Sequence, residues 1–201
     1  MDDNKVGPER LNALSDGVIA IAITLLVLGI EVPSDHNFTE DGIKSFLIKL
    51  EPGLIAYVTS FIIVGLYWIM HHNIFNKIKE VNSMVILLNL LFLFLISLVP
   101  FIAKLKTFYR YDLLVIFIYG ISFMITGFVL WIIWKYIIDH PELHKEKIDK
   151  NTARRLNLYI WIIPIFTIVA LTLAIINIHV GAYSFLLIPF VYLVVNRYKI
   201  T

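Results

Sequence analysis

The residues best suited to chemistry lie at the start of the first apolar run. Arg10, Ser15 and Asp16 precede a long stretch without charge. A carboxylate beside such a stretch is costly to bury unless it is paired or hydrated. One interpretation is that Asp16 caps a helix and complements its dipole. The other is that Asp16 bonds to polar groups on neighbouring helices.

Further polar residues occur in the middle of the chain. Trp68, His71 and His72 lie at the end of one apolar run, and Asn89 interrupts the next. Indole, imidazole and amide groups can each form hydrogen bonds with a carboxylate or a hydroxyl. We therefore predict one interhelical polar network made of Arg10, Ser15, Asp16, Trp68, His71, His72 and Asn89.

The same residues allow a proton relay, in which Asp16 and His71 or His72 would serve a proton-coupled transporter. No metal site is predicted, because adjacent histidines on a helix point about 100° apart and chelate poorly. The sequence has no cysteine, which excludes thiolate ligands and a thiol nucleophile. It has no recognisable serine triad and no phosphate-binding loop, so we predict neither an enzyme nor a bound cofactor.

The composition indicates a membrane protein. Of the 201 residues, 59% are hydrophobic and 16% are charged, and the mean hydropathy is +0.83. Soluble domains are about 45–50% apolar and about 25% charged. A soluble enzyme and a nucleic-acid-binding protein are thereby excluded, and the expected partner is the lipid bilayer.

Charged residues divide the sequence into segments long enough to cross a hydrocarbon core of about 30 Å. Residues 156–196 carry no Asp, Glu, Lys or Arg and hold two segments, because Asn177 and Gly181 favour a turn between them. We predict an all-α polytopic membrane protein with a single domain over 1–201, and an outer loop over 31–52. Its six transmembrane helices are expected at about 11–30, 53–75, 82–103, 113–136, 156–177 and 181–196.

Basic residues predict the orientation, because Lys and Arg accumulate in cytoplasmic loops. With a cytoplasmic N-terminus, most of the 17 Lys and Arg residues lie on the inner side. Trp68, Trp131, Trp134 and Trp161 then all lie near the inner interface, which suits amphipathic rings. Both termini are therefore expected in the cytoplasm.

A helical wheel at about 100° per residue separates two faces of the first helix. Ile21, Leu25 and Leu28 form an apolar stripe with Thr24 beside it, and Asp16 does not share its face. The opposite face is equally apolar. Periodicity alone therefore also allows this stripe to contact lipid or a neighbouring helix.

One motif resembles a known family. The pattern Arg10-x-x-x-Leu14-Ser15-Asp16, with the apolar run after it, is similar to the start of helix 1 in the transmembrane protein 175 family of potassium channels. The family motif has phenylalanine where this chain has Leu14. The substitution keeps an apolar side chain but loses the ring.

A second stretch, Tyr67-Trp68-x-x-His71-His72, is similar to the family as well. Prokaryotic members have six helices and cytoplasmic termini, so the resemblance covers the whole chain. It implies a homotetramer in the plasma (inner) membrane of a prokaryote. Such a channel conducts potassium ions without a carbonyl-lined filter.

The resemblance also implies roles for individual residues. Rings of apolar side chains from helix 1 of each subunit would constrict the pore at Ile21, Leu25 and Leu28, with Thr24 as a hydroxyl ring. The Arg/Ser/Asp group would be a structural network that ties helix 1 to its neighbours. The expected function is a potassium-selective channel, and the proton-coupled transporter is the alternative.

Overall fold

The computed structural model of the protein describes residues 7–30 and 40–197, and helices make up most of these ranges. They are α1 (Pro8–Leu25), η1 (Leu26–Gly29), α2 (Glu40–Phe75), α3 (Ser83–Phe108), α4 (Leu113–Asp139), η2 (Pro141–Leu143), α5 (Lys150–Ile176), α6 (Ile178–Ser184), η3 (Phe185–Leu187) and α7 (Ile188–Arg197). Within the described ranges, six segments are long and apolar enough to cross a membrane. The predicted all-α fold with six transmembrane helices is confirmed.

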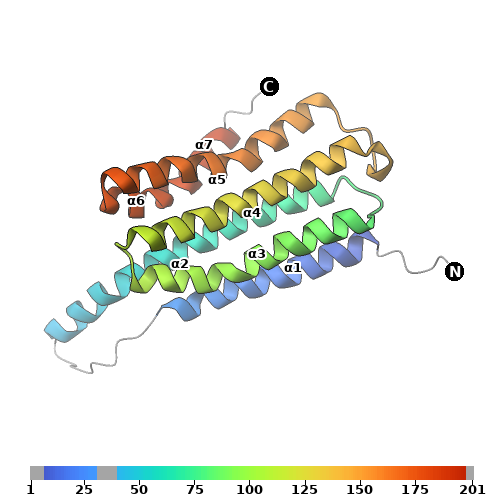
Figure 1. Cartoon of the computed structure of the whole chain (residues 1–201). Helices are drawn as coiled ribbons and strands as arrows, with labels where there is room; N and C mark the ends of the chain where they lie inside the picture. The colour runs from blue at the N-terminus through green and yellow to red at the C-terminus, as the bar shows by residue number, and fades with distance from the viewer. Residues whose placement is uncertain (1–6, 31–39, 198–201) are drawn as a thin grey trace.

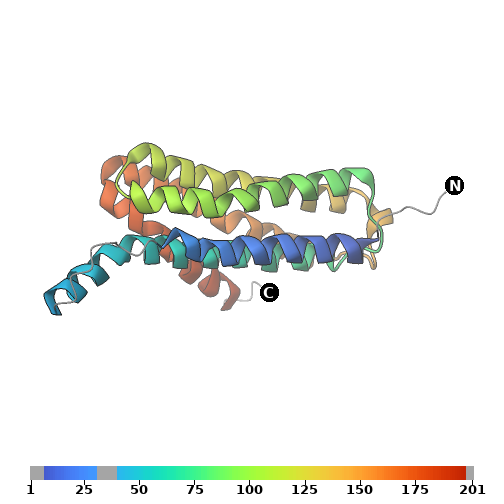
Figure 2. The same cartoon turned by 90° about the horizontal axis from the view of Figure 1, so that it is seen from below.

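The long helices run side by side along the molecule (Figure 1). Helices α1, α2 and α7 lie in one layer, and α3 and α4 lie in the other (Figure 2). Helix α5 packs mainly against α4, and α1 packs against α2 and α3. This arrangement leaves α1 at an edge of the bundle, with one side not covered by the other described helices.

Helix α2 begins much earlier than the sequence predicts. It starts at Glu40, so residues 40–52, which were predicted to belong to an outer loop, are helical, and the first turns of α2 project beyond the bundle (Figure 1). Charged side chains mark where hydrocarbon ends, but a helix satisfies its own backbone and can continue into water. Residues 31–39, the rest of the predicted loop, lie outside the described residues.

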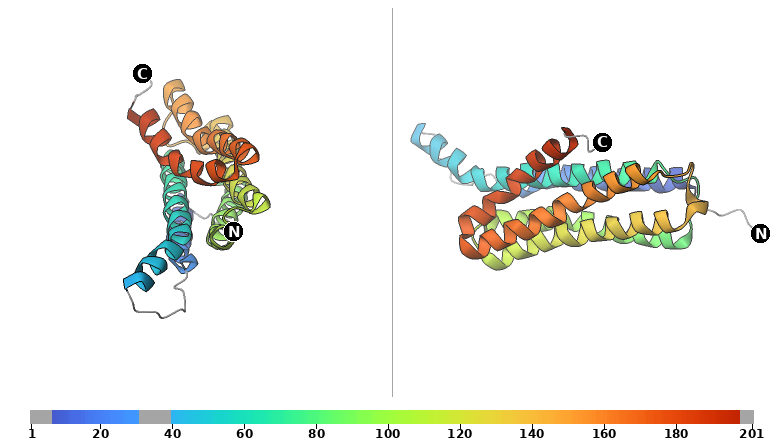
Figure 3. Two further views of the ribbon diagram at one scale, coloured as in Figure 1. Left: turned by 90° about the vertical axis from the view of Figure 1, so that its left-hand side faces the viewer. Right: turned by 90° about the horizontal axis from the view of Figure 1, so that it is seen from above.

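Asn177 separates the last two membrane-spanning segments, at the turn that the sequence predicts. Helix α5 ends just before it, and its side chain accepts hydrogen bonds from the backbone of His179 and Val180, at 3.0 and 3.2 Å. Gly181 then lies against Ala174, where a Cβ atom would overlap the neighbouring backbone. Helices α5 and α6 therefore form a tight hairpin at one end of the bundle (Figure 3).

Polar side chains also begin three of the other helices. Asn82, Asp112 and Asp149 each accept a hydrogen bond from a backbone N–H in the first turn of α3, α4 and α5. Such caps satisfy N–H groups that have no partner within the helix. Hydrogen bonds from Thr152 lower the pKa of the Asp149 carboxyl, so this cap keeps its charge to a lower pH than an ordinary aspartate does.

Tyr67, the first residue of the Tyr67-Trp68-x-x-His71-His72 motif, links α2 to α4. Tyr67 is buried, and its hydroxyl donates a hydrogen bond to the carbonyl oxygen of Phe123 at 2.6 Å. Gly127 makes this approach possible, because a Cβ atom there would lie 2.9 Å from the Tyr67 hydroxyl and 2.6 Å from Pro164 Cγ. A single small residue thus lets α2, α4 and α5 meet.

Candidate functional site

The predicted apolar stripe is the uncovered side of α1. Ile21, Leu25 and Leu28 expose 60%, 44% and 66% of their surface, and Thr24 is exposed beside them. The Thr24 hydroxyl donates a hydrogen bond to the carbonyl oxygen of Ile21 at 2.9 Å. The four side chains therefore present a largely apolar surface to whatever lies beside α1.

Helix α1 tightens at the end of this stripe. Residues 26–29 form a 3₁₀ turn, in which side chains three residues apart eclipse one another. Leu25 is the residue just before this turn, so Leu28 lies closer to the line of Leu25 than it would in a uniform α-helix.

The opposite face of α1 is buried against the rest of the bundle. It consists of Leu11, Ser15, Ile19, Ala22 and Leu26. These residues pack on α2 and α3. The sequence could not distinguish two equally apolar faces, and the packing does so, because one face is covered by the chain and the other is not.

Three polar residues bridge α1, α2 and α3 within this packing, and we call them the buried network: Ser15, His71 and Asn89. The Asn89 amide donates to the Ser15 hydroxyl at 3.0 Å, and that hydroxyl donates to the carbonyl of Leu11 at 2.8 Å. The Asn89 carbonyl oxygen lies 2.7 Å from Nε2 of His71. An amide oxygen can only accept, so Nε2 of His71 carries the proton.

Aromatic rings enclose the histidine of the buried network. Phe75 and Phe92 stack on the His71 ring, with centroids 4.1 and 5.2 Å away. All three members of the network are buried. A polar group in such surroundings is costly without a partner, which makes each bond of this network structurally important.

Three of the remaining predicted members, Asp16, Trp68 and His72, lie on the surface next to the buried network. The indole N–H of Trp68 donates to Asp16 at 2.8 Å, and the Trp68 ring stacks on His72 at 5.6 Å. All three residues are exposed. Asp16 therefore finds a donor on α2, as an interhelical contact requires, and does not enter the buried network.

The contacts expected for Arg10 and for the proton relay are not found among the described residues. Arg10 is exposed, and its side chain forms no hydrogen bond or ion pair within residues 7–30 and 40–197. In the same part of the chain, no hydrogen bond joins Asp16 to His71 or His72. The structure thus divides the predicted single network into a buried part and an exposed part, with Arg10 apart from both.

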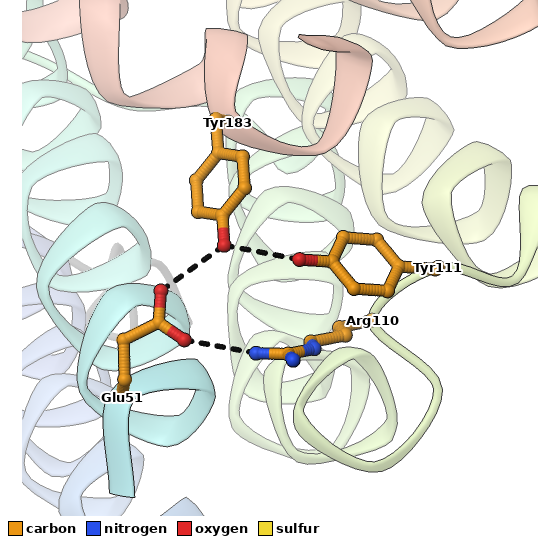
Figure 4. Close-up of polar contacts among 4 residues, drawn as sticks. All are labelled: Glu51, Arg110, Tyr111 and Tyr183. Atoms are coloured by element: carbon orange, nitrogen blue, oxygen red, sulfur yellow. Dashed lines mark hydrogen bonds and ion pairs between the residues drawn. The ribbon is translucent and has the colours of Figure 1, made fainter. Parts of the chain in front are cut away.

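A different polar cluster, which the sequence analysis missed, lies at the other end of the bundle (Figure 4). We call Glu51, Arg110, Tyr111 and Tyr183 the rim network. Glu51 pairs with Arg110 at 2.8 Å and accepts a hydrogen bond from Tyr183 at 3.0 Å. The hydroxyls of Tyr111 and Tyr183 lie 3.1 Å apart. The network links α2, α6 and the turn between α3 and α4.

Comparisons with known proteins identify the family. Residues 10–100 match the family described as endosomal/lysosomal potassium channel TMEM175. A Chryseobacterium protein named as a potassium channel is 43% identical over 91 residues, which span 45% of this chain and 44% of that protein. A Chamaesiphon minutus protein, also named as a potassium channel, is 34% identical over 145 residues, covering 71% of this chain and 71% of that protein. This chain belongs to the TMEM175 family.

A solved TMEM175 structure matches almost the whole chain. It is the crystal structure of a lysosomal potassium-selective channel TMEM175 homologue from Chamaesiphon minutus. The TM-score is 0.80 at 29% sequence identity, and the match covers 94% of this chain and 98% of the other. The six-helix fold is therefore that of a TMEM175 channel.

In this TMEM175 chain, the first motif divides between the two sides of α1. Leu14, at the position of the family's phenylalanine, is exposed on the uncovered side with Ile21. Ser15 points into the bundle. The one departure from the motif therefore falls on the surface that includes the apolar stripe.

A buried cation is the second feature of this TMEM175 chain that the sequence analysis missed. Lys106 lies near the end of α3, and its ammonium donates to the carbonyl of Ala182 at 3.3 Å. The ammonium also lies over the rings of Tyr119 and Phe185, 4.0 and 4.8 Å from their centroids. Lys106 comes after the helix predicted at 82–103, and nothing in the local sequence indicates that α6 covers it.

Proposed function

We propose that this chain forms a homotetrameric potassium-selective channel in which α1 of each subunit lines the pore. Membership of a family described as potassium channels supports the potassium channel. The single observation that carries the pore lining is the apolar stripe of α1, which no other helix in the described part of the chain covers. One six-helix chain cannot surround a pore with one copy of α1, so assembly is required.

In this channel, rings of Ile21, Leu25 and Leu28 constrict the pore, and Thr24 contributes a ring of hydroxyls. An apolar constriction closes by losing its water and opens by widening. Sodium holds its hydration shell more tightly than potassium, so partial dehydration at the constriction penalises sodium more. Selectivity then needs no ring of backbone carbonyls.

The polar residues of α1 have a structural role in this proposal. The buried network and the Asp16–Trp68 bond hold the covered side of α1 while its other side faces the pore. Arg10 forms no ion pair within the described part of its own chain. In the proposed tetramer, its partner lies on a neighbouring subunit.

The proposed location is the plasma membrane of a prokaryote, with both termini in the cytoplasm. The bacterial relatives support a prokaryotic membrane, and the distribution of Lys and Arg supports the orientation. Potassium is the permeant ion in this proposal, which includes no resident cofactor.

The decisive experiment is ion flux from proteoliposomes containing the purified protein. Vesicles loaded with potassium are compared with vesicles loaded with sodium, and no proton gradient is imposed. We expect potassium flux to exceed sodium flux. Ile21→Asn should raise conductance and reduce the preference for potassium, because it places a polar group at the constriction.

The matched control is Leu87→Asn. Leu87 of α3 is as exposed as Ile21, at 62% against 60%, but it lies on a different helix. We expect this variant to keep the flux and selectivity of the original protein. Equal effects of both substitutions, or unchanged flux in Ile21→Asn, would contradict the assignment of Ile21 to the pore.

The same vesicles test the alternative of a proton-coupled transporter. That mechanism predicts flux only when a proton gradient is applied, and loss of flux in Asp16→Asn while the protein remains folded and assembled. The channel proposal predicts that Asp16→Ala lowers the yield of tetramer before it alters selectivity. Size-exclusion chromatography with light scattering separates the two outcomes.

A further inference from the structure

A large groove opens on the side of the bundle, away from the apolar stripe of α1. It lies between α2, α5 and α7 and has a volume of about 870 Å³. Figure 3 shows the cause, since α7 diverges from the neighbouring helices as it leaves the hairpin. The apolar part of the groove is lined by Ile62, Leu66, Ile69, Leu156, Pro189 and Leu193.

One end of this groove is polar and cationic. Lys77 follows the end of α2, and Arg155 lies in the second turn of α5. Asn73, Asn76 and Thr152 add hydrogen-bonding groups beside them. Among the described residues, no Asp or Glu lines the groove, and neither Lys77 nor Arg155 forms an ion pair. The groove therefore combines two basic side chains, neither in an ion pair with a described residue, with a long apolar surface.

The backbone at the cationic end is held in place. The Lys77 carbonyl accepts a hydrogen bond from the N–H of Lys145 at 2.8 Å, and the N–H of Lys79 donates to Leu143 at 2.9 Å. These bonds join the segment after α2 to the segment between α4 and α5. The Lys77 side chain thus starts from a fixed position at the mouth of the groove.

The dimensions of the groove fit one leaflet of a bilayer. From Ile62 to Asn73, α2 rises by about 16 Å at 1.5 Å per residue. This length is close to half of the hydrocarbon core, which is about 30 Å thick. The rings of Tyr159 and Tyr192, 5.5 Å apart, also line the groove, where they can pack against a lipid chain.

We propose that this groove binds one anionic phospholipid. Its phosphate is recognised by Lys77 and Arg155, and an acyl chain lies along α2 under α7. Basic pockets between transmembrane helices recognise anionic headgroups in this way. A free phosphate ion would use only the polar end of the groove, and the apolar end is what selects a lipid.

The test is native mass spectrometry of the purified, detergent-solubilised protein. It is titrated with phosphatidylglycerol and, separately, with phosphatidylcholine carrying identical acyl chains. We expect tighter binding of phosphatidylglycerol. The Lys77→Gln/Arg155→Gln variant should bind phosphatidylglycerol about 30-fold more weakly, since each basic group contributes roughly 1 kcal/mol near an anionic lipid.

A matched control removes the same charge outside the groove. Lys79 and Arg154 are exposed, and neither lines it. Lys79→Gln/Arg154→Gln should keep its preference for phosphatidylglycerol within about twofold, since it retains both groove cations. Equal binding of the two lipids to the original protein would overturn the proposal, and so would equal losses in the two variants.

A second variant tests the apolar end. Ile69→Trp places a larger ring in the groove and should weaken phosphatidylglycerol binding while leaving Lys77 and Arg155 in place. Unchanged binding would exclude the acyl chain from the groove. None of these substitutions alters the apolar stripe of α1, and lipid binding is measured without ion flux. A negative result for lipid binding would therefore not contradict the proposed channel function.

A neighbouring subunit is the competing occupant of the groove. The chain has no cysteine, so Ile69→Cys supplies a single thiol there. In vesicles of phosphatidylglycerol, a lipid groove predicts labelling by a membrane-soluble maleimide. Protection of this thiol in the assembled protein, with labelling after dissociation, would overturn the lipid assignment in favour of a subunit contact.

Discussion

The buried network and the rim network join helices at opposite ends of the bundle, but they do so in different surroundings. Ser15, His71 and Asn89 are buried among aromatic rings. The Glu51–Arg110 pair is charged, yet each of its side chains remains 41% exposed. Neutral hydrogen bonds thus join the helices at the buried network, and an ion pair joins them at the partly exposed rim network.

The presence of charge does not make the rim network the more stabilising of the two. An exposed ion pair is worth about 0–1 kcal/mol because water screens it. Loss of one partner from a buried hydrogen bond costs about 1–3 kcal/mol, because the other partner stays buried and unsatisfied. The neutral network should therefore contribute more to stability than the charged one.

The largest effect is expected from the hairpin that carries Tyr183 to the rim network. Gly181→Ala should lower the free energy of unfolding by about 3 kcal/mol, because its Cβ would overlap the backbone at Ala174. The control is Gly65→Ala, whose Cβ meets nothing within 4 Å. Unfolding in mixed micelles with increasing dodecyl sulfate measures both, and equal stability of the two variants would show that the hairpin is not tight.

The next largest effect concerns the buried network. Asn89→Leu should cost about 2 kcal/mol, since it leaves Nε2–H of His71 without an acceptor. The double variant Asn89→Leu/His71→Phe should recover part of that loss, because replacing both partners by apolar groups removes the unsatisfied donor. The same unfolding measurement applies. A double variant less stable than Asn89→Leu would mean that His71 acts through other contacts.

The smallest effect is expected at the rim network. Glu51→Gln should cost about 0.5 kcal/mol at low salt, and the cost should shrink at high salt because the pair is screened. Tyr183→Phe removes a hydroxyl from the same network but no charge, so its effect should depend less on salt. A cost for Glu51→Gln above that of Asn89→Leu would reverse the comparison between the two networks.

Much of the fold could be predicted because the membrane imposes simple rules. A segment free of charge and long enough to cross the hydrocarbon must be a helix, since its backbone has no other partner there. The ends of the helices were less predictable. Helix α2 begins at Glu40 because a helix can continue beyond the hydrocarbon, where charged residues no longer oppose it.

The candidate site was predictable where local sequence carried the signal. The spacing of Ile21, Leu25 and Leu28 specifies one face of a helix, and Ser15 and Asp16 stand out in an apolar run. The bond between Glu51 and Tyr183 carries no such signal, because it joins residues far apart in the chain. Lys106 was missed for the same reason, since α6 covers it only in the folded structure.

The amino-acid sequence was enough to identify a helical membrane protein and the residues that share each face of α1. Composition, charge placement and helical periodicity are local properties that can be read without knowledge of the packing. The folded structure was needed to find which face of α1 is covered, how the polar residues divide into a buried and an exposed part, and where the groove lies. Those features arise from contacts between distant segments, and a local pattern does not encode which segments meet.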